Sequence, residues 1–177
     1  MFGVNLRLNK DDIDNILNGT DENSVYVQSI VDNLVTECCA SLDNYVDYVV
    51  SIMNNTDYPL TSIELDDIIM TIPAILYSVG TCQEKLGIKK DVSETTRKQM
   101  YNKIILETSG TATEKKSAAE LKLFNEELVT VLYDRAYNII KSKVAFATEL
   151  LQSAKKVVSR RMAEAELSKV TPNQTKI

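Results

Sequence analysis

The chain has 177 residues, a formal net charge of −5, and neither histidine nor tryptophan. The absence of histidine removes the usual general acid and base of enzymes and the commonest transition-metal ligand, so we expect no catalytic site, no metal and no cofactor. Apolar residues make up 44% of the chain, and there are only five glycines and three prolines, which favours long helices over a β-sandwich or barrel.

Formal charge is divided unevenly between the two halves of the chain. Residues 1–84 hold two basic and 14 acidic side chains, a net charge of −12, whereas residues 85–177 hold 18 basic and 11 acidic side chains, a net charge of +7. A two-signed protein can present its basic part to a polyanion while its acidic part meets a basic partner. We therefore divide the chain into an acidic helical region at 1–90, a basic helical region at 91–170 and a flexible tail at 171–177.

The acidic region begins with a short alternating segment, which helices follow. Apolar and polar residues alternate at 4–8, and this predicts a short strand or an extended lead-in. A helix is expected to start near Asn9 and to stop at Gly19. Apolar residues at helical spacing then predict a longer helix from about Ser24 to Met53, followed by a break at 54–59.

The segment after this break predicts another helix that a proline disturbs. Thr61 and Glu64 match a capping box, in which each residue satisfies a backbone amide of the other, and they predict a helix from Ile63 to about Leu86. Pro73 should kink or split this helix, because proline lacks an amide hydrogen and its ring clashes with the preceding turn. Gly87 is expected to end it, and a further helix is expected from about Ser93 to Thr108, closed by Gly110.

The last predicted helix is the longest. Thr111 and Glu114 form a second capping box, and no glycine or proline interrupts the chain from there to Pro172. Apolar residues recur at steps of three and four, near the period of a coiled-coil seam. The short preceding helices cannot cover this stripe alone, so we expect it to pack against another copy of the chain. The fold class we expect is all-α, a helical bundle with a long, self-associating C-terminal helix.

The cysteines and the N-terminus indicate in which cellular compartment the protein resides. Cys38, Cys39 and Cys82 match no zinc-binding spacing, and an odd number is a poor disulfide framework, so we expect buried free thiols in a reducing cytosol. The N-terminus has no basic segment followed by an apolar one, and no stretch reaches the roughly 18 apolar residues of a bilayer span. We therefore expect a cytoplasmic protein without membrane contact.

A run of basic residues on the long helix is the strongest candidate for a functional site. Seven bases, with one acid (Glu149) among them, are Arg135, Lys141, Lys143, Lys155, Lys156, Arg160 and Arg161. Such residues neutralise phosphates and release counterions, which gives salt-sensitive affinity for nucleic acid. The alternative is a solvated helix that pairs with the acidic half, within the chain or between subunits. Lys156 and Arg160 share one face, but Lys143 and Lys155 lie away from it, so a single patch would need an oligomer.

Two tyrosines precede one of these bases on the same ridge of the helix: Tyr133, Tyr137 and Lys141 follow at steps of four. A nucleobase of single-stranded nucleic acid can stack on a tyrosine ring while the lysine binds a phosphate. The alternative is that both tyrosines border the apolar seam and keep their hydroxyl groups in water.

The C-terminal half resembles the recombination-mediator proteins of tailed phages, the UvsY type. The resemblance rests on the Tyr- and Lys-rich helix that ends in a Ser-Gly turn (101–110), on Ile139-Ile140-Lys141-Ser142-Lys143, and on the basic end of the long helix. It implies an all-helical protein that assembles into a ring, binds single-stranded DNA and helps to load a RecA-like recombinase. The residues that would contact phosphate are Lys141, Lys143, Lys155, Lys156, Arg160 and Arg161, and the acidic half would engage a partner protein.

Two functions therefore remain open from the sequence. The first is a non-enzymatic, oligomeric accessory protein that binds single-stranded nucleic acid in the cytoplasm of a phage host. The second is a structural or assembly protein of a virion or scaffold, whose acidic and basic halves pair between subunits.

Overall fold

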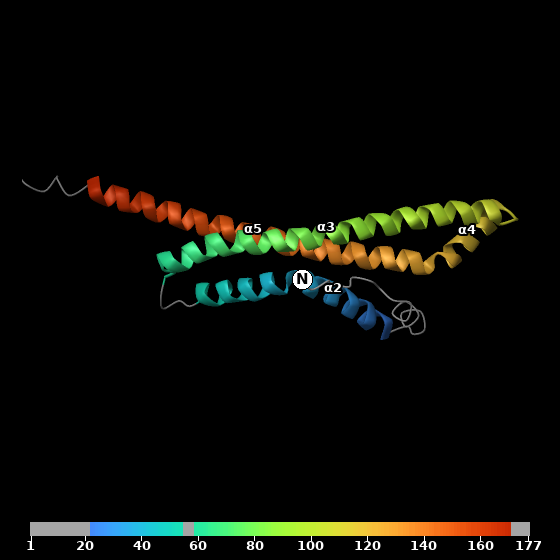
Figure 1. The fold of residues 1–177 in the computed structure, drawn as a ribbon, viewed down its shortest axis with the longest axis horizontal. Helices are drawn as coiled ribbons and strands as arrows, with labels where there is room; N and C mark the ends of the chain where they lie inside the picture. Colours follow the sequence, from blue (N-terminus) through green and yellow to red (C-terminus); the bar gives the residue numbers. More distant parts are fainter. Residues whose placement is uncertain (1–21, 55–58, 171–177) are drawn as a thin grey trace, which may run out of the picture. The chain divides into compact units, whose positions relative to one another are not determined.

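The computed structural model describes residues 22–54 and 59–170 (Figure 1). This part of the chain forms four helices and no strand: α2 (Glu22–Met53), α3 (Ser62–Glu107), α4 (Ala112–Lys122) and α5 (Phe124–Val170). The all-α class is confirmed, as is the helix expected from about Ser24 to Met53. The segment at 4–8, the helix between Asn9 and Gly19, and the tail at 171–177 lie outside the described residues.

The described helices form two compact units, each built from segments that are distant in the sequence. The first unit contains residues 22–39 and 80–141, and the second contains residues 40–54, 59–79 and 142–170. Helices α2, α3 and α5 each contribute a segment to both units. Each unit therefore takes residues from both the acidic region 1–90 and the basic region 91–170.

The first unit packs α2, α3, α4 and the start of α5 around an apolar core. Two ion pairs join α3 to α5 there: Lys90 Nζ lies 2.5 Å from Asp134 Oδ1, and Arg97 Nη1 lies 3.6 Å from Glu127 Oε1. The core follows the helical spacing of each segment, as a buried helix face requires. Its buried residues are Ile30, Val31, Leu34, Val35, Cys39, Leu86, Ala119, Leu123, Leu132, Tyr133, Ala136 and Ile140.

A disulfide between Cys38 of α2 and Cys82 of α3 fastens the first unit. The two Cα atoms are 5.6 Å apart, a separation that adjoining helices reach when their cysteines face each other. The prediction of three buried free thiols is therefore wrong for this pair, and it is confirmed for Cys39, which is free and buried. The pairing was not visible in the sequence, because 44 positions separate the two residues and only the packing of α2 on α3 brings them together.

The second unit packs the end of α2, the start of α3 and the rest of α5. Tyr45 of α2 donates a hydrogen bond of 2.7 Å to Asp67 of α3, and Lys143 of α5 lies 2.6 Å from Asp43 of α2. Burial, and then the bond to Asp67, raises the pKa of Tyr45 to about 12. The buried residues of this unit are Leu42, Val49, Leu65, Ile68, Ile72, Val79, Ala147, Leu151 and Ala154.

Helix α3 is continuous where the sequence predicted two helices. Pro73 lies on the exposed side of the helix, so its ring points away from the packed neighbours. Ile72, the residue before it, is fully buried in the core. Gly87 lies within the helix, and a Cβ atom at this position would come within 3.3 Å of the Tyr137 ring of α5. The glycine therefore serves close packing between α3 and α5 and does not end the helix.

The helix predicted to run unbroken from residue 111 bends at Leu123, between α4 and α5. Leu123 is buried, its amide donates to the Ala119 carbonyl, and its own carbonyl accepts from the Glu127 amide, so the bend costs few hydrogen bonds. The stripe of α5 is buried from Leu132 to Ala154 within the chain. The premise that the neighbouring helices are too short to cover this stripe is thus wrong for residues 132–154, because α3 has 46 residues, and packing against another copy stays a prediction.

Both predicted capping boxes are confirmed. Glu64 accepts a hydrogen bond of 2.7 Å from the Thr61 amide, and Glu114 accepts one of 2.7 Å from the Thr111 amide. Each threonine hydroxyl accepts from the amide of its glutamate in return. Gly110 precedes the second box with a φ of +127°, which only glycine adopts without strain, and a Cβ atom there would lie 2.7 Å from the Glu114 carboxylate.

Candidate nucleic-acid interface

The predicted basic residues of α5 are divided between the two units. In the second unit, Lys155, Lys156 and Arg160 are exposed, and we call these three residues the basic face. Lys156 and Arg160 lie on the side of α5 opposite the buried Leu151 and Ala154, whereas Lys155 follows Leu151 by one turn and lies beside the buried side, with its side chain exposed. No acidic residue occurs in α5 between positions 150 and 163, and Glu149 and Glu164 border this surface at its two ends.

Two of the predicted bases in the second unit are bound to carboxylates. Lys143 pairs with Asp43, and Arg160 Nε lies 2.8 Å from Glu164 one turn along the same helix. Arg160 stays exposed in its pair, and an exposed pair of this kind is weak, so the guanidinium can exchange partners. Lys155 and Lys156 form no ion pair with any residue in 22–54 or 59–170.

Arg161 lies apart from the basic face. It is half-buried and borders a cleft of about 200 Å³ between α3 and α5 of the second unit. Asp66 borders the same cleft, and Leu65 and Met162 are among its other lining residues. The structure therefore places Arg161 beside a carboxylate of the acidic region, on the side of α5 that packs against α3.

The other predicted residues belong to the first unit. Arg135 and Lys141 are exposed and pair with no carboxylate of the described residues. Tyr133 is only 8% exposed and lies 6.0 Å from Lys89 Nζ, so its ring is part of the core and has no free face for a base. Tyr137 is half-buried against Gly87 and Lys90, which matches the alternative that these tyrosines border the apolar seam.

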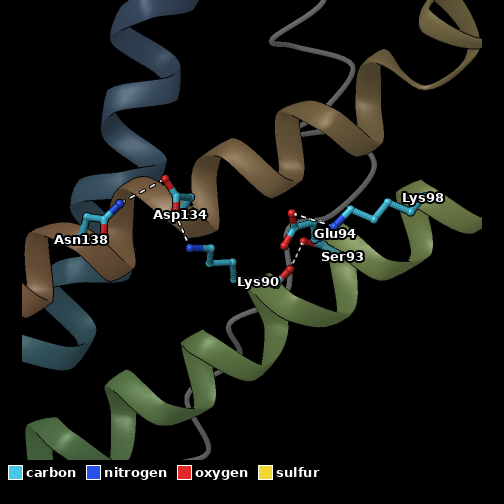
Figure 2. Close-up of polar contacts among 6 residues, drawn as sticks. All are labelled: Lys90, Ser93, Glu94, Lys98, Asp134 and Asn138. Atoms are coloured by element: carbon cyan, nitrogen blue, oxygen red, sulfur yellow. Dashed lines mark hydrogen bonds and ion pairs between the residues drawn. The ribbon is translucent and has the colours of Figure 1, made fainter. Parts of the chain in front are cut away.

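A polar cluster that the sequence did not single out surrounds Lys90 in the first unit. Figure 2 shows Lys90 of α3 directed at Asp134 of α5, whose second oxygen accepts a hydrogen bond of 3.1 Å from Asn138. The hydrogen bond to Asp134 raises the pKa of Lys90 above its usual value. Nearby, Lys98 pairs with Glu94 on α3. These charges satisfy one another, so the cluster fastens α3 to α5 and offers little net charge to a ligand.

Phe146 is an exposed aromatic residue that the sequence analysis missed. It lies in the second unit, its side chain is 52% exposed, and it precedes Arg160 by 14 positions on α5, which is two steps of seven. Residues at steps of seven share one side of a helix, so Phe146 lies on the same side as Lys156 and Arg160. This spacing was the available signal. Glu149 is exposed on this side as well and would repel a phosphate.

Other possible sites are occupied or absent in the described part of the chain. The N-terminus of α4 could attract an anion, but the Glu114 carboxylate already accepts its hydrogen bonds, and these bonds lower the pKa of Glu114. Among residues 22–54 and 59–170, no group of three or more cysteine, aspartate or glutamate side chains is placed to hold a metal ion.

Helix α3 contains a long apolar segment. By length and composition alone it could cross a membrane, because an 18-residue window reaches a mean hydropathy of 1.3, and 22% of that window is buried. The expectation of no membrane contact thus stays a prediction.

No protein-family model, curated protein or solved structure matches the chain. The geometry of the two units is therefore the basis for a functional proposal.

Proposed function

We propose that the protein is a non-enzymatic, oligomeric accessory protein that binds single-stranded nucleic acid, in the manner of a recombination or replication mediator. The observation that carries the proposal is the basic face, where Lys155 and Lys156 are exposed without a carboxylate partner among the described residues and Arg160 has only an exposed one. Cationic side chains of this kind bind phosphates without regard to sequence, and counterion release makes the binding weaken as salt rises.

Phe146 supports a preference for single strands. A base of a single strand is free to stack on an exposed ring, whereas the bases of a duplex are stacked on each other. Phe146 shares its side of α5 with Lys156 and Arg160, so one strand can meet a ring and two cations along the same helix. In this proposal Phe146 is the residue that stacks with a nucleobase, a role that the sequence predicted for Tyr133 and Tyr137.

The second function, a virion or scaffold protein, also has one supporting observation. In the second unit, the described parts of α2 and α3 carry five acids and no base, while α5 carries six bases. Only Lys143 of these bases forms an ion pair with those acids. The remaining charges are available to another molecule, and that molecule can be a nucleic acid or a second copy.

The test is fluorescence anisotropy with a labelled single-stranded homopolymer, titrated with the full chain across a series of salt concentrations. We expect binding that weakens steeply with salt. Replacing Lys155, Lys156 and Arg160 together by alanine should lower the salt slope by about 2, since each phosphate contact on a single strand contributes about 0.7. Phe146→Ala should weaken binding to the single strand and leave binding to a duplex unchanged, and Glu149→Gln should strengthen both.

A matched control removes three lysines that pair with glutamates in the first unit, Lys98, Lys103 and Lys116. This triple alanine variant carries the same net charge as the basic-face variant, so it separates a local contact from a general charge effect. An equal loss of affinity in both triple variants, or no binding by the wild type at low salt, would overturn the proposal.

A further inference from the structure

In the second unit, helix α3 is apolar on two opposite sides. Its buried side consists of Leu65, Ile68, Ile72 and Val79, which belong to the core. Its opposite side exposes Ile63, Met70 and Tyr77, with exposed fractions of 81%, 73% and 83%. We call these three residues the outer stripe. They follow one another at steps of seven, so they lie in one line along the helix.

A helix that is apolar all round is normally covered all round. The outer stripe places three large apolar side chains in water along two full heptads, which is the pattern of a surface that receives another helix. Single exposed apolar residues need no such explanation, but a line of them opposite the core does. The cover for Ile63 and Met70 must come from outside the described chain, since no residue of 22–54 or 59–170 buries these two side chains.

The charges beside the outer stripe restrict what can cover it. Asp66 and Asp67 are exposed and flank Ile63 on either side of the line, and the sequence has no lysine or arginine from position 59 to position 84. Two outer stripes placed in parallel would bring these aspartates together, and like charges in contact oppose binding. Two stripes placed antiparallel would leave the aspartates without a cation, because neither copy supplies one there. The covering helix must therefore supply cations together with apolar surface.

Within the described chain, the basic face of α5 meets this requirement best. Other exposed lysines, such as Lys98, Lys103 and Lys116, each pair with a glutamate one turn along their own helix. Arg135 and Lys141 form no ion pair with a described residue either, but they stand six positions apart, whereas three cations fall within residues 155–160 with no acid between them. Lys155 and Lys156 pair with none of the described residues. Lysine and arginine side chains have long apolar stems, which can cover Ile63 and Met70 while their charged ends reach Asp66 and Asp67.

We propose that the outer stripe of α3 binds the basic face of α5 of a second copy of this chain. The contact joins two different surfaces, and each copy carries one of each. The copies then assemble as a reciprocal pair, a closed ring or an open row. The contact does not depend on nucleic acid, so it is measured without nucleic acid and stands or falls separately from the function proposed above.

The experiment is sedimentation velocity of the full chain across a range of concentrations and ionic strengths. We expect association that weakens as salt rises, because the aspartates and cations lie at an exposed contact. Ile63→Ser with Met70→Ser should reduce association at least tenfold while circular dichroism stays unchanged, since both side chains are exposed. Ile88→Ser with Val92→Ser is the matched control, because these exposed residues lie on α3 in the first unit, and it should associate as the wild type does.

A charge exchange provides the decisive step. A variant with Lys155→Glu, Lys156→Glu and Arg160→Glu should not associate alone, and neither should a variant with Asp66→Lys and Asp67→Lys. A mixture of the two should associate, because the reversed charges are again complementary. Asp67 accepts a hydrogen bond from Tyr45, so Asp66→Lys alone is the second acidic variant if the double one fails to fold. A wild type that stays a single copy throughout, a stripe variant that associates normally, or a mixture without association would overturn the proposal.

Discussion

Lys143 Nζ lies 2.6 Å from Asp43 Oδ1, and through this pair a basic residue of α5 meets a carboxylate of the acidic first half of the chain. Among the described residues, the only other ion pair that an α5 base forms is the one from Arg160 to Glu164 on the same helix. Among residues 22–54 and 59–170, ion pairing between the two halves is therefore limited to this one contact, and most bases of α5 pair with no described carboxylate of the first half.

Asp43→Asn should have a small effect on stability and none on nucleic-acid binding. Both side chains of the pair are half-exposed, and such pairs contribute about 1 kcal/mol or less. Lys143 lies on the side of α5 that packs in the second unit, away from the basic face, so its release should add no phosphate contact. Urea unfolding and the anisotropy titration measure the two effects. A gain in affinity would place Lys143 in the nucleic-acid contact.

Two glycines of α3 should respond differently to alanine. A Cβ atom at Gly80 would meet nothing within 4 Å, so Gly80→Ala should stabilise the protein by about 0.5–1 kcal/mol through helix propensity. A Cβ atom at Gly87 would lie 3.3 Å from Tyr137 Cε2, so the ring must shift and Gly87→Ala should gain less or lose stability. Thermal unfolding of both variants tests the contrast, and equal gains would show that α3 and α5 do not approach closely at this point.

Loss of the Cys38–Cys82 disulfide should destabilise the protein markedly. The bridge spans 44 positions, and in the chain-entropy account a closed loop of this size contributes about 4 kcal/mol. Denaturant unfolding of the oxidised protein, the reduced protein and a Cys82→Ser variant measures the difference. Alkylation of the unfolded, oxidised protein should label one thiol, that of Cys39. Three labelled thiols would contradict the bridge.

The capping boxes should make the starts of α3 and α4 sensitive to acid. The hydrogen bond from the Thr111 amide lowers the pKa of Glu114, and that from the Thr61 amide lowers the pKa of Glu64. A carboxyl whose pKa is lower in the folded state stabilises the fold above its unfolded pKa and loses this contribution as pH falls through its folded pKa. The protection factors of the Glu114 and Lys115 amides, which are corrected for the pH dependence of the intrinsic exchange rate, should therefore fall on acidification. They should fall less in Glu114→Gln, which can keep a capping bond without titrating. An equal loss of protection in both proteins would count against the coupling.

Nucleic acid and the outer stripe should compete, because both proposals use Lys155, Lys156 and Arg160. Addition of a single-stranded oligonucleotide to associated protein should release single copies bound to the strand, in proportion to the occupancy of the basic face. Sedimentation velocity with a labelled strand follows both species. Phe146→Ala should require more oligonucleotide for the same release. If the copies stayed associated while the oligonucleotide was fully bound, nucleic acid and the outer stripe would have to contact different basic residues.

Local signals in the sequence predicted the ends of several helices correctly. The Thr61–Glu64 and Thr111–Glu114 boxes act over three residues, so the sequence alone contains the whole interaction. The helix neither splits at Pro73 nor ends at Gly87, because packing outweighed local preference: Ile72 and Leu86, the residues before them, are completely buried. The bend at Leu123 carries no glycine or proline, and burial of the leucine side chain is what marks it.

The site was predictable in composition but not in arrangement. Helical projection correctly put Lys156 and Arg160 on one side of α5, since both belong to one regular element. It could not tell that Tyr133 is buried, that Lys143 meets Asp43, or that Phe146 is exposed, because each of these depends on which side of α5 the other helices cover. Similarly, the apolar residues of α3 fall on two sides, and spacing alone does not distinguish the covered side from the outer stripe.

Helices α2, α3 and α5 each pass from one compact unit into the other without a break. Each crossing between the units therefore lies inside a helix, where a cut would split a continuous element, and shortening the chain from either end removes one of the segments from which a unit is built. A deletion variant that loses an activity would for this reason be misfolded, and its loss would not show where the binding surface lies. Single side-chain replacements are the appropriate way to locate binding surfaces in this protein.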